Sequence, residues 1–168
     1  MGEYEIVQHE FEPVYNENSR ILILGTIPSV KSRENHFYYG HPQNRFWKVL
    51  AELVSCELPQ TIEEKKQMLL LHKIAVWDVL KSCEIVGSGD SSIRAEIPNE
   101  ILPLLQKTQI KKVFTNGKKA EAFYQKYCRA ETGVESVCLP STSPANAAWS
   151  LDKLVQVWRK EMNPFLID

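Results

Sequence analysis

The sequence lacks the features that mark several classes of protein. No two of its four cysteines stand at the C-x-x-C spacing of zinc ribbons and thioredoxin-like redox sites. Its longest apolar runs, such as residues 21–24, are far shorter than the roughly 20 residues that cross a bilayer. The first nineteen residues hold five glutamates and no lysine or arginine, unlike a secretory or transit signal. We therefore expect a cytoplasmic protein with free thiols and no membrane segment.

The sequence also lacks a strong net charge, an internal repeat and a low-complexity linker. Its 20 basic and 21 acidic side chains leave a net charge of −1, unlike the strongly basic composition of histone-like DNA binders. A near-neutral chain can still carry a locally basic face, so this balance does not exclude an enzyme that acts on DNA. The length of 168 residues predicts a single domain over residues 1–168, whose core needs no disulfide or structural metal.

What the sequence does contain is an alternation of apolar strands and amphipathic helices. Short apolar runs predict strands at 20–25, 73–77, 112–115 and 134–139. Apolar periodicity and cap residues predict helices at 44–53, 61–71, 99–105, 118–127 and 146–160. Residues 78–97 are predicted to form a long polar loop. Strands that alternate with helices indicate an α/β fold, with a parallel sheet covered on both faces.

In a parallel sheet, ligands bind beyond the carboxyl ends of the strands, so the relevant segments are 26–45, 78–94, 116–119 and 140–148. The first of these mixes aromatic rings with cations, and residues 31–48 hold four cations against one carboxylate, a charge of +3. Phosphates on the cations and bases on the rings would suit a nucleic acid. A solvated loop whose aromatic side chains lie in the core explains the same composition.

The last of these segments, P-S-T-S-P-A-N-A at 140–147, offers hydroxyl and backbone N–H groups ahead of the predicted helix at 146–160. Such donors at a helix N-terminus form a cradle for an anion such as phosphate. An ordinary helix cap with proline-rich turns is the alternative interpretation of these residues.

Four stretches together carry a resemblance to a known family. They are G-T-I-P-S at 25–29, W-D-V-L at 77–80, the octapeptide at 140–147 and, most specific, Y-Y-G-H-P-Q-N-R-F-W at 38–47. The chain resembles members of the uracil-DNA glycosylase superfamily, and most of all the hypoxanthine-DNA (deoxyinosine) glycosylase type. This resemblance implies a three-layer α-β-α domain with a central four-stranded parallel sheet. It also implies excision of deaminated bases from DNA.

Two positions depart from the main branches of that superfamily. The Asp or Asn that holds the attacking water two residues after the first glycine is Ile27 here, and a His before the second Pro-Ser is Leu139. In the hypoxanthine type, the key polar residue is an Asn in the second half of the first loop, which corresponds to Asn44. We expect Asn44 to be catalytic and to position the water through its amide oxygen. Capping of the following helix is the alternative role.

The resemblance also implies a base pocket. Tyr39 would stack on a base flipped out of the duplex, unless it packs in the core. Asp78 would accept the N1–H of hypoxanthine or the N3–H of uracil, a proton that adenine and cytosine lack, unless it caps a turn. The other expected pocket residues are Gly25, Thr26, Ile27, Pro28 and Ser29. Contacts to DNA are expected from Lys31, Arg33, Arg45, Ser141, Thr142, Ser143, Pro144, Ala145 and Asn146.

Other polar residues give weaker signals. Ser88, Ser91 and Ser92 are phosphate candidates, although a flexible loop explains them as well. His36 and His41 have no Cys or carboxylate partners at metal-ligand spacing. We therefore expect both histidines to make structural hydrogen bonds, and we expect neither a metal nor another cofactor.

The leading hypothesis is a monofunctional DNA glycosylase of base excision repair that acts on hypoxanthine first and uracil second. It would be a monomer whose partner is DNA containing deaminated bases. A damaged-DNA binding module without catalysis is the alternative, because Ile27 and Leu139 replace the usual catalytic groups. A serine hydrolase based on Ser141 or Ser143 is a third hypothesis, although no G-x-S-x-G elbow supports it.

The charge is unevenly distributed along the chain. Residues 31–48 carry +3, residues 107–129 carry +6 and the first nineteen residues carry −5. Within 107–129, Lys118 and Lys119 stand nearest the predicted strand ends, although a solvated helix face explains these cations too. We expect 31–48 to surround the pocket and the acidic N-terminal segment to lie away from it.

Overall fold

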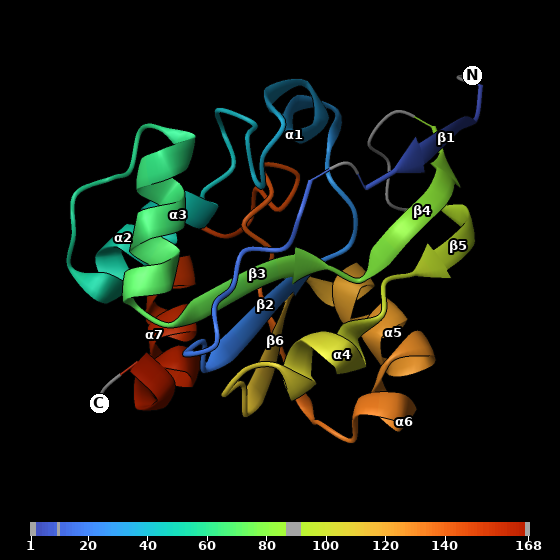
Figure 1. Ribbon diagram of the computed structural model, residues 1–168. Helices are drawn as coiled ribbons and strands as arrows, with labels where there is room; N and C mark the ends of the chain where they lie inside the picture. Colours follow the sequence, from blue (N-terminus) through green and yellow to red (C-terminus); the bar gives the residue numbers. More distant parts are fainter. Residues whose placement is uncertain (1–2, 10, 87–91, 167–168) are drawn as a thin grey trace.

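Four parallel strands form the central sheet of the computed structural model, which describes residues 3–9, 11–86 and 92–166. In the order β3-β2-β6-β7, the strands are Ile74–Asp78, Ile21–Gly25, Lys112–Asn116 and Ser136–Leu139. They match the four strands expected from the sequence, so the predicted parallel sheet is confirmed. Figure 1 shows this sheet passing through the middle of the molecule.

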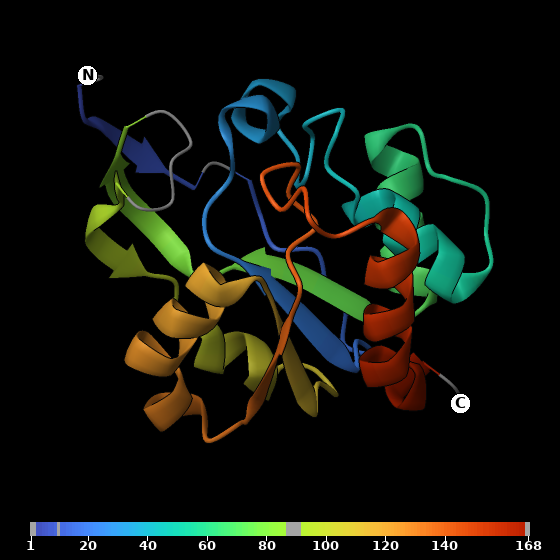
Figure 2. The same cartoon turned by 180° about the vertical axis from the view of Figure 1, so that it is seen from behind.

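Helices cover both faces of the sheet and complete the expected three-layer α-β-α arrangement (Figures 1 and 2). One face carries α2 (Phe46–Val54), α3 (Ile62–Leu71) and α7 (Leu151–Leu166). The other carries α4 (Ile101–Gln106), α5 (Lys118–Tyr127) and α6 (Arg129–Thr132). Because successive side chains of a strand point to opposite faces, Ile21 and Ile23 of β2 enter the first core. Leu22 and Leu24 enter the second.

A second, antiparallel sheet lies where a polar loop was predicted. Its order is β1-β4-β5, with β1 (Glu5–Gln8), β4 (Leu80–Ile85) and β5 (Arg94–Pro98). The prediction of a loop over 78–97 is therefore wrong at both ends of that range. Register shifts between β4 and β5 interrupt the even alternation of buried and exposed side chains by which a strand is recognised.

The helices agree with the sequence except at their ends. The capping box of α3 is present, since Glu64 N donates to Thr61 Oγ1 at 3.0 Å and Thr61 N to Glu64 Oε1 at 3.1 Å. A short helix that was not predicted, α1 (Val30–Asn35), follows β2. The last helix begins at Leu151 instead of residue 146, so the segment after β7 is longer than expected.

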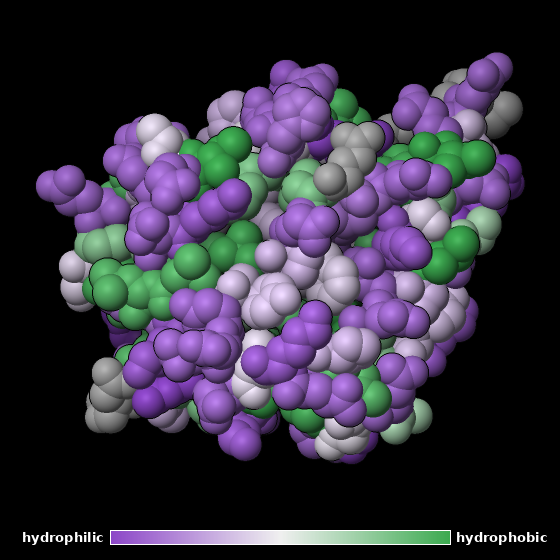
Figure 3. Space-filling model, in the orientation of Figure 1, coloured by the Kyte–Doolittle hydropathy of each residue, from purple (hydrophilic) through white to green (hydrophobic). Residues whose placement is uncertain are grey.

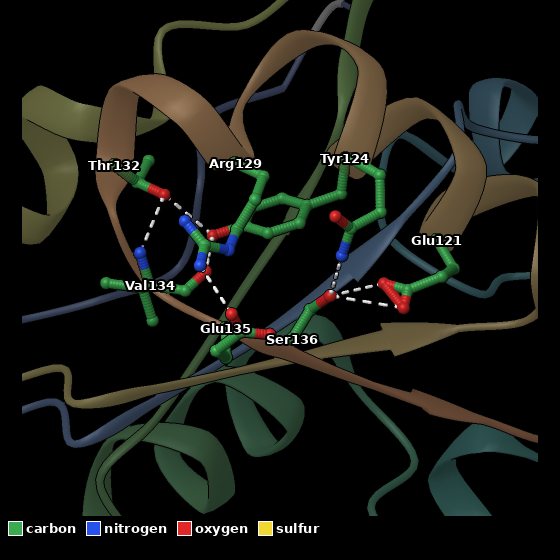
Figure 4. Close-up of polar contacts among 8 residues, drawn as sticks. Glu121, Tyr124, Arg129, Thr132, Val134, Glu135 and Ser136 are labelled. Carbon is green, nitrogen blue, oxygen red and sulfur yellow. Dashed lines mark hydrogen bonds and ion pairs between the residues drawn. The ribbon is translucent and has the colours of Figure 1, made fainter.

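Polar contacts fix the junction of α5, α6 and β7 (Figure 4). The Tyr124 hydroxyl lies 2.8 Å from Thr132 Oγ1, and Arg129 pairs with Glu135. The pair neutralises Arg129, one of the cations of the basic segment 107–129. This arrangement agrees with a solvated helix face for that segment.

The surface mixes polar and apolar side chains. Figure 3 shows apolar groups on the side where α2 and α3 lie. Exposed large apolar residues on or beside α3 are Leu58, Ile62 and Leu71. Across the described ranges, no helix is both long enough and apolar enough to cross a membrane.

Candidate active site

A cavity of about 640 Å³ opens at the carboxyl edge of the parallel sheet. Gly25, Asp78 and Asn116 end strands β2, β3 and β6 beneath it, and the segments 26–44 and 141–145 contribute its walls. The strand order runs in both directions from β2, and open α/β sheets bind ligands where such a reversal occurs. Figures 1 and 2 both show these two segments side by side above the sheet.

Most residues singled out from the sequence line this cavity. The expected pocket residues among them are Gly25, Thr26, Ile27, Pro28, Ser29, Tyr39 and Asp78. Asn44 joins them, with the expected DNA contacts Lys31, Ser141, Thr142, Ser143, Pro144 and Ala145. The remaining expected contacts, Arg33, Arg45 and Asn146, stand outside the lining. Asn116 also lines the cavity, although it was not named as a site residue from the sequence. Its position directly after a predicted strand was the signal that could have identified it.

A chain of hydrogen bonds holds Asn44 in the cavity wall. Its Oδ1 accepts from the Phe46 N–H at 2.9 Å and from the Thr142 hydroxyl at 2.8 Å. Thr142 is fully buried, and its Oγ1 accepts from Asn116 Nδ2 at 3.0 Å. The Thr142 N–H donates to Asn116 Oδ1 at 3.1 Å. Because a backbone N–H can only donate, the Phe46 contact identifies the oxygen end of the Asn44 amide.

The Asn44 oxygen therefore has both of its lone pairs engaged. This finding differs from the expectation that the oxygen holds the attacking water. The hydrogen bond from the Phe46 N–H, the first of α2, resembles the helix-capping role that was the alternative for Asn44, although the N-cap residue itself is Arg45. No described residue accepts a hydrogen bond from Asn44 Nδ2, so the group that Asn44 offers to the cavity is a donor.

Asp78 lies at the floor of the cavity and is almost completely buried. Its Oδ2 is 2.8 Å from His9 Nε2, and the two side chains are only 5% and 3% exposed. A Cβ atom on Gly25 would lie 2.4 Å from Asp78 Oδ1 and 2.9 Å from the Tyr39 hydroxyl. Both groups thus approach the backbone at a position where only glycine leaves room for them.

Tyr39 connects the cavity with the core. Its ring stacks on Phe46, with centroids 3.9 Å apart and an interplanar angle of 19°. Its φ of +53° is rare for a bulky residue and is found more often at functional sites. Burial, followed by the charge of Asp78, raises the pKa of Tyr39 above its usual range, so the hydroxyl stays protonated. Tyr39 therefore lines the cavity while one face of its ring packs in the core.

Arg45 ties the segment after β7 to the start of α2. Its guanidinium donates to the backbone carbonyls of Thr142, Ser143, Asn146 and Trp149. Its backbone N–H donates to the Thr142 carbonyl at 3.1 Å. These bonds hold residues 142–149 in turns, which is why α7 begins later than predicted. The expected anion cradle at the start of a helix at residue 146 is therefore absent from that position.

The weaker candidates have varied surroundings. Ser88 and Ser91 lie outside the described residues, and Ser92 Oγ accepts from the Val86 N–H at 2.9 Å. His41 Nδ1 accepts from the Gln43 N–H at 3.0 Å, a local hydrogen bond of the expected kind. Within the part of the chain that the structure covers, no three His, Cys, Asp or Glu side chains are grouped to hold a metal ion.

The structure bears on both charge expectations. Residues 31–48 contribute Lys31, Tyr39 and Asn44 to the cavity lining, but the other cations of this stretch, Arg33, Arg45 and Lys48, stand outside it. The N-terminal segment was expected to lie away from the pocket, yet it supplies His9 to Asp78. Val14 also pairs with Val76 beside the sheet, so this segment runs along β3.

Comparisons with known proteins identify the family of this fold and cavity. The model of the uracil DNA glycosylase superfamily matches residues 12–165. A hypoxanthine DNA glycosylase from Methanosarcina barkeri is 38% identical over 138 residues, 81% of this chain and 86% of its own length. One from Methanosarcina acetivorans is 35% identical over 150 residues, 88% and 94% of the two chains.

A solved structure agrees with these sequence relatives. The solution NMR structure of a protein from Methanosarcina acetivorans, described as a candidate uracil DNA glycosylase, superimposes with a TM-score of 0.78 and 33% identity. The match covers 93% of this chain and 98% of the other. With a family model that spans nearly its whole length, this chain belongs to the uracil DNA glycosylase superfamily.

Proposed function

We propose that this protein is a monofunctional DNA glycosylase that hydrolyses the N-glycosidic bond of deaminated bases, hypoxanthine first and uracil second. The observation that carries the proposal is a cavity that combines a buried carboxylate, Asp78, with an amide donor, Asn44, at the carboxyl edge of the sheet. The two relatives named hypoxanthine DNA glycosylase support the choice of the first base.

Base recognition begins with extrusion of the nucleotide, because the glycosidic bond is inaccessible in a stacked duplex. In the cavity, Asp78 Oδ1 accepts the N1–H of hypoxanthine, while Oδ2 stays on His9. Adenine carries no proton at N1, so the same contact opposes two lone pairs and disfavours the normal base. Uracil offers an equivalent N3–H, which supports it as the second substrate. The Tyr39 ring forms an apolar wall for either base.

Catalysis requires stabilisation of the charges that develop as the C1′–N bond breaks. Negative charge builds on the leaving base, and a preorganised donor in a water-poor cavity stabilises it. Asn44 Nδ2 supplies this donor, because its oxygen is held by Phe46 and Thr142. We therefore assign Asn44 to the leaving base in place of the attacking water.

The DNA backbone would lie across the rim of the cavity. Lys31 and Arg33 from α1 and residues 141–145 after β7 are the proposed phosphate and sugar contacts. Lys31 Nζ is 3.2 Å from Glu34 but is about half exposed, so this surface pair opens readily for a phosphate. Arg45 is not among these proposed contacts, because its guanidinium donates to the backbone carbonyls of the segment after β7 and holds that segment in place.

A strand-cleavage assay tests the proposal. Labelled duplexes with a single inosine, uracil or mismatched thymine are incubated with the protein and EDTA, then heated in alkali to break abasic sites. We expect cleavage at inosine, slower cleavage at uracil and no effect of EDTA. Absence of cleavage on every duplex would refute the proposed glycosylase activity. Salt-sensitive binding without cleavage would favour the damaged-DNA binding module.

The substitution Asn44→Asp separates the donor role from an acceptor role. Its carboxylate can still accept from Phe46 and Thr142 but presents a second acceptor, not a donor, to the cavity. We expect the excision rate to fall about a hundredfold or more, as when an oxyanion donor is removed. An Asn44→Asp variant as fast as the parent would show that an acceptor serves the reaction.

A further inference from the structure

His9 makes a buried contact with the cavity from outside the segments that the sequence singled out. It follows β1, and its Nε2 lies 2.8 Å from Asp78 Oδ2, with side-chain exposures of 3% and 5%. Sixty-nine positions separate the two residues in the chain. The N-terminal segment thus supplies a direct partner for the acceptor that faces the base.

Both partners are fixed by further contacts. The His9 N–H donates to the Lys81 carbonyl at 2.8 Å, and the ring lies 4.9 Å from Phe11 and 5.6 Å from Tyr38. The backbone carbonyl of Asp78 accepts from Asn99 Nδ2 at 2.9 Å. The carboxylate therefore has little freedom to rotate while His9 holds Oδ2.

The second carboxylate oxygen is left for a ligand. Asp78 Oδ1 and the Tyr39 hydroxyl both lie over Gly25 at the cavity floor. The Tyr39 hydroxyl is buried and has no hydrogen-bond partner among the described residues. Of the groups that surround the carboxylate, His9 alone forms a hydrogen bond with a side-chain oxygen of Asp78 within the described part of the chain.

We propose that His9 is a positioning residue that holds the Asp78 carboxylate with Oδ1 over Gly25 and thereby sets the base selectivity of the cavity. The inference rests on the proposed function. Without the His9 donor, Asp78 Oδ2 would be a buried acceptor with no partner, and the carboxylate could rotate away from the orientation that the pair now fixes. Asp78 Oδ1 would then no longer be held over Gly25 to accept the N1–H of hypoxanthine, so loss of His9 weakens the preference for this base over adenine.

Two substitutions separate the donor of His9 from its ring. His9→Gln keeps an N–H donor, whereas His9→Phe keeps the aromatic packing and removes the donor. His72→Ala is the matched control, because His72 ends α3 at the opposite end of β3 from Asp78. Melting temperature is recorded for each protein, so that activity is compared among folded variants only.

The readouts are kcat/KM on an inosine duplex and the preference for inosine over adenine in duplex binding by fluorescence anisotropy. We expect His9→Phe to reduce both by about tenfold or more, the factor that corresponds to one hydrogen bond to a charged group. His9→Gln should recover most of the loss, and His72→Ala should match the parent. In an Asp78→Asn background, His9→Phe should change either readout less than about twofold, since linked residues are not additive.

The outcomes distinguish this inference from the proposed function. If the parent excises inosine and folded His9→Phe keeps the parent kcat/KM and base preference, the role of His9 is refuted. An equal loss in the parent and Asp78→Asn backgrounds would also refute it, because His9 would then act independently of Asp78. If the parent excises no base, the proposed function fails, and the binding preference still tests the role of His9.

Discussion

Thr142→Val is the sharpest test of the hydrogen-bond chain that orients Asn44. The substitution replaces a fully buried hydroxyl by a methyl group of similar size. It removes the donor to Asn44 Oδ1 and the acceptor for Asn116 Nδ2, at 2.8 Å and 3.0 Å. Leaving such groups unpaired costs about 1–3 kcal/mol in free energy of unfolding. For a chain of this size, the melting temperature should fall by roughly 2–12 °C.

The substitution should also slow the reaction. Without the Thr142 hydroxyl, one of the two bonds that fix the Asn44 amide is lost, and its donor is no longer held towards the cavity. We expect kcat on an inosine duplex to fall at least about tenfold, since misplacement by about 1 Å can reduce a rate about a hundredfold. Single-turnover kinetics with folded protein measure this change.

Two further variants make the result interpretable. Thr142→Ser keeps the hydroxyl and should keep most of the rate. Thr108→Val removes a hydroxyl that donates to the Leu104 carbonyl at 3.1 Å, away from the cavity, and should affect stability alone. A Thr142→Val protein that melts earlier but excises inosine at the parent rate would refute the role of Thr142 in orienting Asn44.

Three other predictions concern the cavity floor, the cavity rim and the buried hydroxyl of Tyr39. Gly25→Ala should lower kcat/KM and destabilise the fold by about 1–3 kcal/mol, because its Cβ would lie 2.4 Å from Asp78 Oδ1. Unchanged kinetics and melting would contradict this close approach of Asp78 to Gly25. Arg45→Ala should lower the free energy of unfolding by at least about 2 kcal/mol and leave the salt dependence of DNA binding unchanged. Arg33→Ala should instead reduce the slope of log K against log salt concentration by about 1. The reverse result would make Arg45 the phosphate contact. The raised pKa of Tyr39 means that the folded protein keeps a proton that the unfolded chain loses, so stability should hold below about pH 10 and fall above it. Denaturant titrations of the parent and of Tyr39→Phe should show a smaller fall in the variant, and equal falls would contradict this assignment.

Local patterns were sufficient for the central architecture. The strands β2 and β3 are short, mostly buried and apolar, and β6 and β7 each contain a short apolar stretch, so their strand character is visible in the residues themselves. Because the carboxyl ends of parallel strands share one edge, the segments that begin at Thr26 and Asp78 were expected near each other, and both residues line the cavity. The irregular β4 was missed, since its pairing with β5 shifts register and breaks the alternation.

Long-range contacts decided how the site residues are oriented. The oxygen of Asn44 is engaged by Thr142, 98 positions away in the chain, and Asp78 is held by His9, 69 positions away. Such contacts leave no periodicity or spacing in the sequence, because an amide or carboxylate turns to whichever partner the fold brings beside it. The sequence by itself thus determined the sheet and the segments that meet at its edge. Only the tertiary structure decided that the Asn44 oxygen bonds to Thr142 and that Asp78 Oδ2 pairs with His9, because these partners come from distant parts of the chain.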